Sequence, residues 1–377
     1  MSIAHPKDKQ TMIIESVELK NYRNYHTLHM QFSPRTNILY GNNAQGKTNI
    51  LEAVYVCCTT KSHRGSKDKE MIHFHEDESH IKLNIKKDQI PYRIDMHLKK
   101  NKTKGIAING IPIKKASELF GIVNVVFFSP EDLKLVKEGP GERRNFLDME
   151  ISQIRPVYNF NINRYNKILF QRNNLLRSSK FQTNISSLLE IFDLQLAKIG
   201  TDIILERDKY VQELSKISSI THNKITLSRE NLELKYLSNI EILDNKIEME
   251  KNYLNKLKKY IDKDIEAAST QLGPHRDDIL MTINDKELKT YGSQGQQRTV
   301  VLSIKLSEVE LIKKQRGIYP VLLLDDVFSE LDEERRKYLI KSFQDMQTLI
   351  TVTDAIDLKE METIEKSIFY IEEGKLM

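Results

Sequence analysis

The stretch Gly41-Asn42-Asn43-Ala44-Gln45-Gly46-Lys47-Thr48 determines how the rest of this 377-residue sequence is interpreted. It matches the pattern G-x-x-x-x-G-K-[ST], in which glycines let a loop curl so that its backbone N–H groups face a phosphate. A short apolar run, Ile38-Leu39-Tyr40, precedes it, and helical apolar spacing follows over residues 49 to 60. The motif requires this order of strand, loop and helix. The sequence therefore predicts an ATP-binding loop at residues 41–48.

The residues of this loop have separate expected tasks. Lys47 is expected to reach the outer phosphates of ATP and to assist its hydrolysis, and Thr48 is expected to hold Mg²⁺ through its hydroxyl. The partial positive charge at the start of the following helix adds to the attraction for phosphate. The other nucleotide contacts expected in the loop are Gly41, Asn42, Asn43, Ala44, Gln45 and Gly46.

A second motif places two carboxylates at the end of an apolar run, in Val321-Leu322-Leu323-Leu324-Asp325-Asp326. The four apolar residues predict a buried strand. Asp325 is expected to bind Mg²⁺ through water, and Asp326 to orient or deprotonate the water that attacks the nucleotide. Apolar strands often end in acids, so the pattern indicates ATPase chemistry only in combination with the phosphate loop.

A third motif, Gly292-Ser293-Gln294-Gly295-Gln296-Gln297-Arg298, opens a predicted helix about 30 residues before the acidic strand. It resembles the signature sequence of ABC ATPases, in which a serine hydroxyl and glycine amides at a helix start form a second phosphate cradle. In those proteins the cradle serves the nucleotide held by a partner subunit. The resemblance implies that Ser293, Gly295 and Gln296 contact the nucleotide of a second copy, in an ATP-dependent homodimer. Taken alone, the motif is more typical of a helix cap.

Several positions depart from the ABC pattern. The segment Ser329-Glu330-Leu331-Asp332 resembles the D-loop that crosses the dimer interface, although Asp332 also suits a helix N-cap. Asp326 stands where ABC enzymes carry a glutamate, and Thr353 stands where they carry a switch histidine. The Q-loop glutamine is missing near residues 128–132. These departures favour slow hydrolysis, so that ATP acts as a switch.

Composition suits a folded protein in a reducing compartment. Hydrophobic residues make up 39% of the chain and charged residues 29%, which argues against wholesale disorder. No run of eighteen apolar residues occurs, so no membrane span is expected. The two cysteines, Cys57 and Cys58, are adjacent in a predicted helix and cannot easily bond to each other, which fits a cytoplasmic location.

The change in the spacing of apolar residues along the chain, from alternating to helical and back, predicts its domain organisation. The fold class expected is α/β, an ABC-type, SMC-like P-loop ATPase head with an inserted, mostly helical second domain. Alternating strand patterns place the head at residues 12–141 and 265–377, and helical spacing places the insertion at residues 142–264. Residues 1–11 are expected to form a disordered extension.

Beyond the nucleotide motifs, the sequence resembles the RecF family of bacterial recombinational repair proteins, which is related to the SMC proteins, over nearly the whole chain from Met12. The resemblance rests on residues 19–25, 62–64, 141–148 and 273–278. It implies an ATP-dependent dimer that binds single-stranded and double-stranded DNA at gap junctions, loads recombinase with RecR and RecO, and supports the SOS response. From the first hairpin of related SMC heads, it also implies a nucleotide contact for Arg23, with Arg64 as a weaker candidate.

Two basic segments are candidates for the DNA surface. Residues 81–120 hold ten Lys and Arg against three acids, and residues 151–200 hold seven against two. Basic segments attract phosphate backbones, and the chain has no recognition-helix motif, so contacts without sequence specificity are expected. A solvated charged face is an equally good interpretation of each. The candidate contacts are Lys99, Lys100, Lys102, Lys104, Arg164, Lys167, Arg172 and Arg177.

Histidine and cysteine patterns point to no further chemistry. His275, in a Gly-Pro-His-Arg turn, is expected to be structural, and no His/Cys cluster with zinc-site spacing occurs. Two other classes of function remain as alternatives. The ATPase subunit of a membrane transporter shares the fold but should carry a switch histidine and a Q-loop glutamine. A small-molecule kinase would leave residues 292–296 unexplained.

Overall fold

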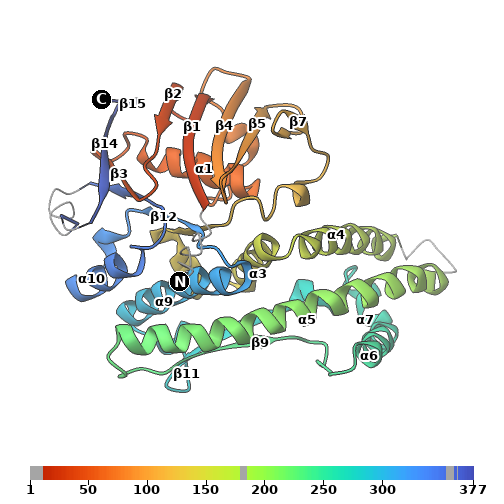
Figure 1. Ribbon diagram of the computed structural model, residues 1–377. Helices are drawn as coiled ribbons and strands as arrows, with labels where there is room; N and C mark the ends of the chain where they lie inside the picture. The colour runs from red at the N-terminus through yellow and green to blue at the C-terminus, as the bar shows by residue number, and fades with distance from the viewer. Residues whose placement is uncertain (1–11, 179–184, 354–360, 363) are drawn as a thin grey trace, which may run out of the picture. The chain divides into compact units, whose positions relative to one another are not determined.

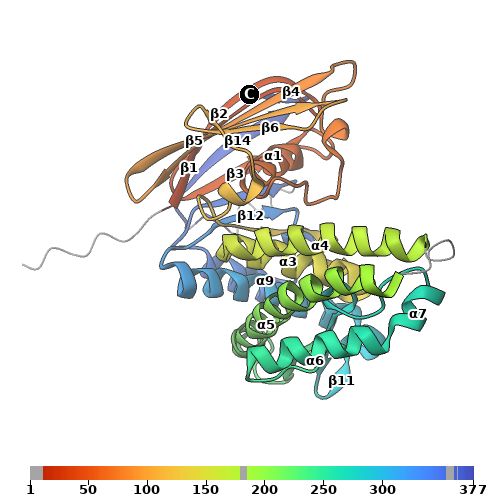
Figure 2. The ribbon, with the colours of Figure 1, turned by 90° about the vertical axis from the view of Figure 1, so that its right-hand side faces the viewer.

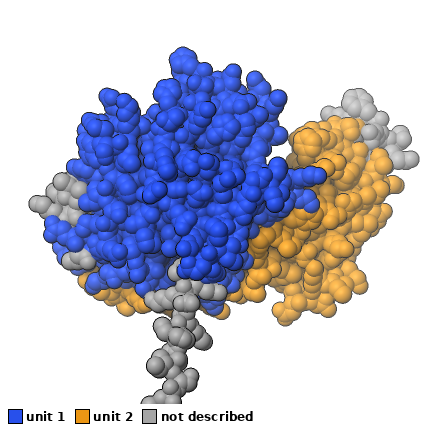
Figure 3. Space-filling view, turned by 45° about the horizontal axis from the view of Figure 1, so that its top comes forward, with its two compact units in different colours: residues 1–133, 301–377 blue, residues 134–300 orange. Residues whose placement is uncertain are grey.

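The computed structural model describes residues 12–178, 185–353, 361–362 and 364–377 (Figure 1). The chain divides into two compact units, coloured separately in Figure 3. Unit 1 comprises residues 1–133 and 301–377, and unit 2 comprises residues 134–300. The expected extension over residues 1–11 lies outside the described residues.

An antiparallel sheet forms one layer of unit 1, in the order β2-β1-β4-β5-β6-β7. Side chains alternate along its strands, so that residues such as Val17, Leu19 and Leu83 are buried while their neighbours face outward. Asn109 and Gly110 form the turn between β6 and β7, and both residues have the positive φ that such a tight hairpin turn requires. The strands are β1 Met12–Tyr22, β2 Tyr25–Gln31, β4 Glu78–Lys87, β5 Ile90–Lys99, β6 Gly105–Ile108 and β7 Ile111–Pro112.

A mostly parallel sheet forms the other layer of unit 1, in the order β15-β14-β3-β13-β12-β8. Helix α1 (Lys47–Thr59) contacts strands of both sheets and is buried along nearly its whole length (Figure 1). Helices α9 (Gln294–Arg316) and α10 (Glu333–Ser342) also belong partly or wholly to this unit. The strands are β3 Thr36–Tyr40, β8 Val125–Phe128, β12 Val321–Asp325, β13 Thr348–Val352, β14 Lys366–Glu372 and β15 Lys375–Leu376.

Unit 2 is mostly helical, and its helices α4, α5 and α6 pack side by side (Figure 2). A three-stranded sheet, β11-β10-β9, adds to it, and β9 lies along α5. The helices are α2 Lys134–Lys137, α3 Pro140–Ile154, α4 Pro156–Arg177, α5 Ile185–Ile225, α6 Lys246–Lys259, α7 Ile261–Glu266 and α8 Leu288–Tyr291. The strands are β9 Leu232–Leu237, β10 Asp278–Ile283 and β11 Lys286–Glu287.

The boundaries expected at residues 141 and 265 do not coincide with those of the compact units. Strand β10, assigned from the sequence to the head, pairs with β9 over six residue pairs from Asp278–Leu237 to Ile283–Leu232. The sheet therefore keeps residues 265–300 with the helices of unit 2. Sequence spacing detects each strand separately but does not show which partner it pairs with.

A buried charge cluster joins the helices of unit 2. Arg172 is fully buried; its Nε donates to Asp193 and its Nη1 to Asp264, both at 2.6 Å, and Nη1 also reaches the Thr270 hydroxyl at 2.8 Å. Arg172 was expected to be a DNA contact, and this assignment is wrong. It lies on the same face of α4 as the buried Tyr165, so it points into the core rather than toward solvent.

A second buried network brings together two of the RecF-like segments of the sequence. Arg143 binds Asp278 through two hydrogen bonds of 2.5 and 3.0 Å. Arg207, also fully buried, donates to Asp148 at 2.7 Å and to the Pro274 carbonyl at 2.6 Å. Residues 141–148 and 273–278 are therefore linked inside unit 2, where buried arginines must be paired to be tolerated.

His275 belongs to the same region and has a structural role, as expected. Its Nδ1 lies 2.8 Å from the Tyr165 hydroxyl, and its Nε2 lies 3.0 Å from the Thr270 carbonyl. Burial lowers the pKa of His275 to about 4, so the ring is neutral at physiological pH.

Replacing Arg172 tests the importance of the buried charge cluster. Arg172→Met leaves the carboxylates of Asp193 and Asp264 facing each other without a cation, so we expect a loss of about 3–5 kcal/mol in the free energy of unfolding. Urea denaturation followed by circular dichroism measures it. The matched control is Arg164→Met on the exposed side of the same helix, which should change stability by less than about 0.5 kcal/mol. Equal stability of the two variants would contradict the prediction.

Candidate nucleotide-binding site

Three segments that are far apart in the sequence meet at one edge of the parallel sheet. Strand β13 lies between β3 and β12, and its register places Val352 opposite Tyr40 and Thr351 opposite Asp325. Because parallel strands end at the same edge, the phosphate loop, the two aspartates and the end of β13 come together. The phosphate loop, Asp326 and the end of β13 line a cavity of about 370 Å³. Its lining residues are Asn43, Ala44, Gln45, Gly46, Lys47, Thr48, Asn49, Arg64, Asp326, Thr351 and Thr353.

The path of the phosphate loop requires glycine at both ends. Gly41 has φ +153°, and a Cβ there would collide with the carbonyl oxygen of Ile371. Gly46 has φ +112°, and a Cβ there would lie 2.7 Å from the Tyr25 hydroxyl. Both conformations are ones that other residues rarely adopt. The motif glycines therefore set the shape of the loop as the sequence predicts.

The C-terminal hairpin supports the same loop from the side. The Gly374 N–H donates to the Gln45 carbonyl at 3.1 Å, and the Glu373 N–H donates to the Gln45 side chain at 2.6 Å. Asn24, in the turn between β1 and β2, donates to the same carbonyl at 3.1 Å. Gln45 is thus tied to two turns, and its backbone position does not depend on the motif alone.

Lys47 is buried and folds back on the loop. Its Nζ donates to the Gly41 carbonyl at 2.5 Å and to the Asn42 carbonyl at 2.7 Å. Burial lowers the pKa of Lys47, while the negative charges of Asp326 and Asp325 oppose that shift. A cation whose hydrogen bonds go to two backbone carbonyls beside a cavity is well placed to exchange them for a phosphate oxygen.

Thr48 and Asp325 meet as the sequence predicts. The Thr48 hydroxyl donates to Asp325 Oδ1 at 2.7 Å, and the Thr351 hydroxyl donates to the same oxygen at 2.9 Å. Burial raises the pKa of Asp325, and the two hydroxyl donors counteract that rise. A hydroxyl and a carboxylate are the oxygen ligands that Mg²⁺ prefers, so these residues fit the expected metal. Thr351 is an additional member of the site that no sequence motif indicates.

Asp326 lies in the cavity beside Lys47. It has φ +51°, a left-handed conformation uncommon for residues other than glycine, and its N–H donates to the Thr351 hydroxyl at 2.9 Å. Burial raises the pKa of Asp326, and the charge of Lys47 lowers it. Thr353, which replaces the switch histidine, also lines the cavity. The two departures from the ABC pattern therefore lie at the same site.

Arg23 lies outside this cavity. Its guanidinium donates to both carboxylate oxygens of Glu52 at 2.6 and 2.7 Å, and it also contacts Ser66 and the Glu70 carbonyl. Glu52 is completely buried on α1 and needs a counter-charge, which explains the position of Arg23. Arg64, the weaker candidate in the sequence, is the arginine that lines the cavity.

The signature residues form a helix cap in unit 2. The Ser293 hydroxyl accepts from the Gln296 N–H at 3.2 Å, and the Ser293 N–H donates to the Gln296 side chain at 2.9 Å. This reciprocal pair is a capping box at the start of α9, so the capping interpretation is confirmed. Ser293 and Gly295 are also exposed. Asp332 likewise caps α10 by accepting from the Arg335 N–H at 3.0 Å.

The basic patches are partly neutralised. Lys104 donates to Asp68 at 2.8 Å and to the Thr60 carbonyl at 2.5 Å, so its charge is bound within unit 1. Lys99 pairs with Glu78 at 3.4 Å, and Lys100 pairs with Asp77 at 3.1 Å. Lys102, Arg164, Lys167 and Arg177 are exposed, as is the paired Lys100.

The sequence matches the RecF/RecN/SMC N terminal domain over residues 13–375. A DNA replication and repair protein RecF from Lachnospira eligens is 50% identical over 368 residues, covering 97% of this chain and 99% of that protein. The chain belongs to the RecF family. Another RecF, from Lachnoclostridium phytofermentans, is 51% identical over 342 residues, covering 91% of this chain and 93% of that protein. The family assignment made from the sequence is therefore confirmed.

Solved structures confirm the fold class. The recombination mediator protein RecF-ATP of the RecFOR pathway is 37% identical, with a TM-score of 0.92 over 99% of both chains. An Smc head domain from Pyrococcus furiosus shares the fold at 15% identity, with a TM-score of 0.54 over 97% of this chain and 96% of that chain. Within the part of the chain that the structure describes, every helix is too short or too polar to cross a membrane.

His63, next to Arg64 at the cavity, gives a test of the local electrostatics. Its ring stacks on Phe127 with centroids 3.9 Å apart, and burial lowers its pKa to about 4. Because the folded pKa lies below the unfolded value of about 6.5, the native state binds fewer protons. The contribution of neutral His63 to the free energy of unfolding is therefore fully present above pH 6.5. It is lost as the pH falls toward 4.

The measurement is an NMR titration of the histidine rings, with His63→Gln identifying the resonance. We expect the His63 signal to titrate near pH 4. An apparent pKa close to 6.5 would contradict the buried, stacked position of the ring.

Proposed function

We propose that this chain is an ATP-dependent DNA-binding protein of recombinational repair and replication restart, in which ATP drives two copies to dimerise. The observation that carries the proposal is the contact of Thr48 with Asp325 beside Lys47, at the loop predicted to hold phosphate. The relatives are named DNA replication and repair protein RecF, which supports a role in DNA binding and repair. The likeness to the solved structure of RecF-ATP supports ATP as the bound nucleotide.

Different residues around the cavity would bind the phosphates of ATP and the Mg²⁺ ion. The N–H groups of residues 43–48 would face the phosphates, and Lys47 would leave the carbonyls of Gly41 and Asn42 to bind the outer ones. Thr48 and Asp325 would hold Mg²⁺, directly and through water. When bound, the metal ion neutralises the negative charge that develops on the transferred phosphoryl group.

Asp326 is the residue proposed to orient or deprotonate the attacking water. Its raised pKa moves a carboxylate toward the range of an effective base, but its side chain is one methylene shorter than the glutamate of ABC enzymes. Thr353 has no ring nitrogen with which to contact the outer phosphate. Both features favour slow hydrolysis, so that the bound state lasts long enough to act as a switch.

Dimerisation would complete the site from a second copy. Ser293 and Gly295 are exposed at the N-terminus of α9, a helix of 23 residues, where the first backbone N–H groups lack partners within the helix. These groups suit the outer phosphate of the nucleotide held by another copy. Hydrolysis then removes the shared contact, and the dimer opens.

DNA binding is proposed to follow from the same dimerisation. Arg164, Lys167 and Lys102 are exposed and can contact phosphates without reading bases. Two copies present twice the number of cations to one duplex, so ATP should strengthen DNA binding and its salt dependence. We propose gap junctions as the preferred DNA, RecR and RecO as partners in recombinase loading, a contribution to the SOS response, and a cytoplasmic location.

Sedimentation with ADP, with ATP and with ATP plus a gapped duplex tests the proposal. We expect a monomer with ADP, a dimer with ATP, and retention of the duplex by that dimer. Lys47→Met should bind ATP at least tenfold more weakly and remain monomeric, because the cation for the outer phosphates is gone.

Ser293→Arg separates ATP binding from dimerisation. It should bind ATP as the wild type does but stay monomeric, since the bulky cation blocks the cradle for the partner's phosphate. Gln212→Arg, which adds the same side chain to the exposed surface of α5, is the matched control and should dimerise. An ATP-dependent dimer of Ser293→Arg would rule out the composite site. A dimer that fails to retain the gapped duplex would contradict the DNA-binding part of the proposal.

A further inference from the structure

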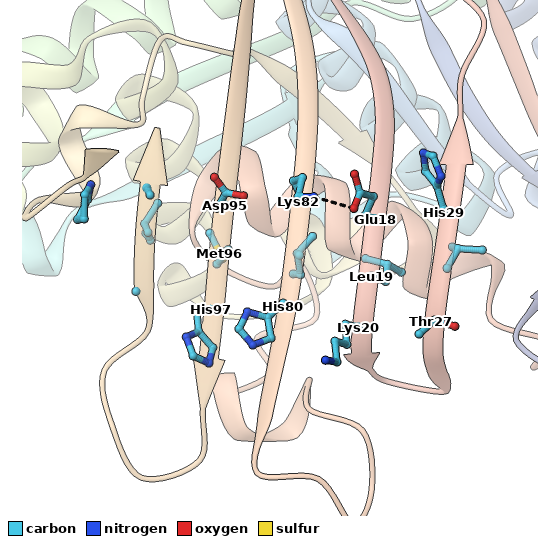
Figure 4. A pocket seen from close by; sticks show the side chains of 16 residues that line it. Glu18, Leu19, Lys20, Thr27, His29, His80, Lys82, Asp95, Met96 and His97 are labelled. Carbon is cyan, nitrogen blue, oxygen red and sulfur yellow. Dashed lines mark hydrogen bonds and ion pairs between the residues drawn. The ribbon is translucent and has the colours of Figure 1, made fainter. Parts of the chain in front are cut away.

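The outer face of the antiparallel sheet in unit 1 carries a cluster of metal-binding side chains that the nucleotide site does not use. In the β4–β5 register His80 lies directly opposite His97. Glu78 lies two residues before His80 on the same strand and therefore shares its face. Figure 4 shows the two histidine rings next to each other on this face, which borders a cavity of about 730 Å³.

The geometry of the cluster brings three ligand atoms together. The two imidazole rings are stacked, with centroids 3.9 Å apart and planes inclined by 25°. His97 Nε2 lies 2.7 Å from Glu78 Oε2, and one ligand atom from each of the three residues lies within 4.8 Å of the others. Ligand atoms around a tetrahedral zinc ion are roughly 3.4 Å apart, from bonds of about 2.0–2.1 Å. Small side-chain rotations are enough to reach that spacing.

We propose that Glu78, His80 and His97 bind a divalent transition metal ion, with Zn²⁺ as the best-suited ion and Co²⁺ as its spectroscopic substitute. Two imidazole nitrogens and one carboxylate oxygen form a ligand set that selects these ions over Mg²⁺, which prefers oxygen ligands alone. Three protein ligands leave a fourth position open. Because the side chains are exposed or half-buried, that position is accessible to water or another ligand.

The sheet holds this site in place without the ion. Strands β4 and β5 pair without interruption from Glu78–Lys99 to Lys87–Ile90, so the backbone positions of all three ligands are fixed by hydrogen bonds elsewhere in the ladder. Metal binding therefore requires side-chain movement only. The ion would join the two strands at the end where Asp77, just before β4, already pairs with Lys100, just after β5, through a backbone hydrogen bond and an ion pair, each of 3.1 Å.

One internal cation competes with the metal. Lys99 Nζ lies 3.4 Å from Glu78 Oε1, and the Glu78 side chain is half exposed. An exposed ion pair of this kind is weak, so a dication held by three ligands can displace it. Removing the lysine charge should therefore strengthen metal binding, an effect that a purely structural cluster would not show.

A second pair of stacked histidines provides a matched control. His26 and His73 have ring centroids 4.0 Å apart and planes inclined by 32°. Among the residues that the structure describes, Glu78, His80 and His97 are the only group of three with converging ligand atoms, so this second pair has no third ligand. The His80 and His97 pair therefore has a carboxylate that completes a metal site, whereas the His26 and His73 pair does not.

The experiment is calorimetric titration of the full chain, stripped with EDTA and free of any histidine tag, with Zn²⁺. Co²⁺ absorption serves as the second readout. We expect one ion per chain at this site, and His80→Gln/His97→Gln should bind it at least about tenfold more weakly. His26→Gln/His73→Gln should bind as the wild type, and Lys99→Gln several-fold more tightly. Circular dichroism establishes that each variant is folded.

Asp325→Asn separates this site from the nucleotide site, because it removes the carboxylate proposed for Mg²⁺. Zinc affinity unchanged in Asp325→Asn but lost in His80→Gln/His97→Gln supports the proposal. Affinity that survives in His80→Gln/His97→Gln, or that falls in the His26 and His73 control to the same extent, would overturn it.

Discussion

The parallel register of β3, β13 and β12 is the constraint on which the rest of unit 1 depends. A shift of β12 by one residue would turn Asp325 to the opposite face of the sheet and separate it from the Thr48 hydroxyl. The register itself is held by buried apolar side chains, since every residue of β12 and β13 is buried. The polar chemistry at the edge is therefore positioned by an apolar core that takes no part in it.

The sequence predicted those features whose residues are close together in the chain. The phosphate loop lies within eight residues, and its spacing already indicates that Gly41 and Gly46 set the path of the backbone, as their positive φ angles show. The acidic strand was predictable because an apolar run followed by carboxylates has few other uses beside such a loop. Capping of α9 by Ser293 was predictable because the capping box is local in the sequence and spans only four residues, 293–296.

Features that depend on pairing between distant segments were missed. Whether an arginine faces a ligand, a buried acid or solvent depends on what packs against it, so Arg23 and Arg172 could not be assigned from charge and spacing. The His80 and His97 pair appears only after the register of β4 and β5 is known. The strand β10 was likewise visible as a strand, but its pairing with β9 placed it in the other unit.

The support of Gln45 by Glu373 and Gly374 has a genetic consequence. A nonsense codon or an exopeptidase that removed residues 373–377 would leave the hydrophobic core intact, yet it would release one side of the loop that we propose binds phosphate. Such a truncated chain should be abundant in the cell but weak in nucleotide affinity.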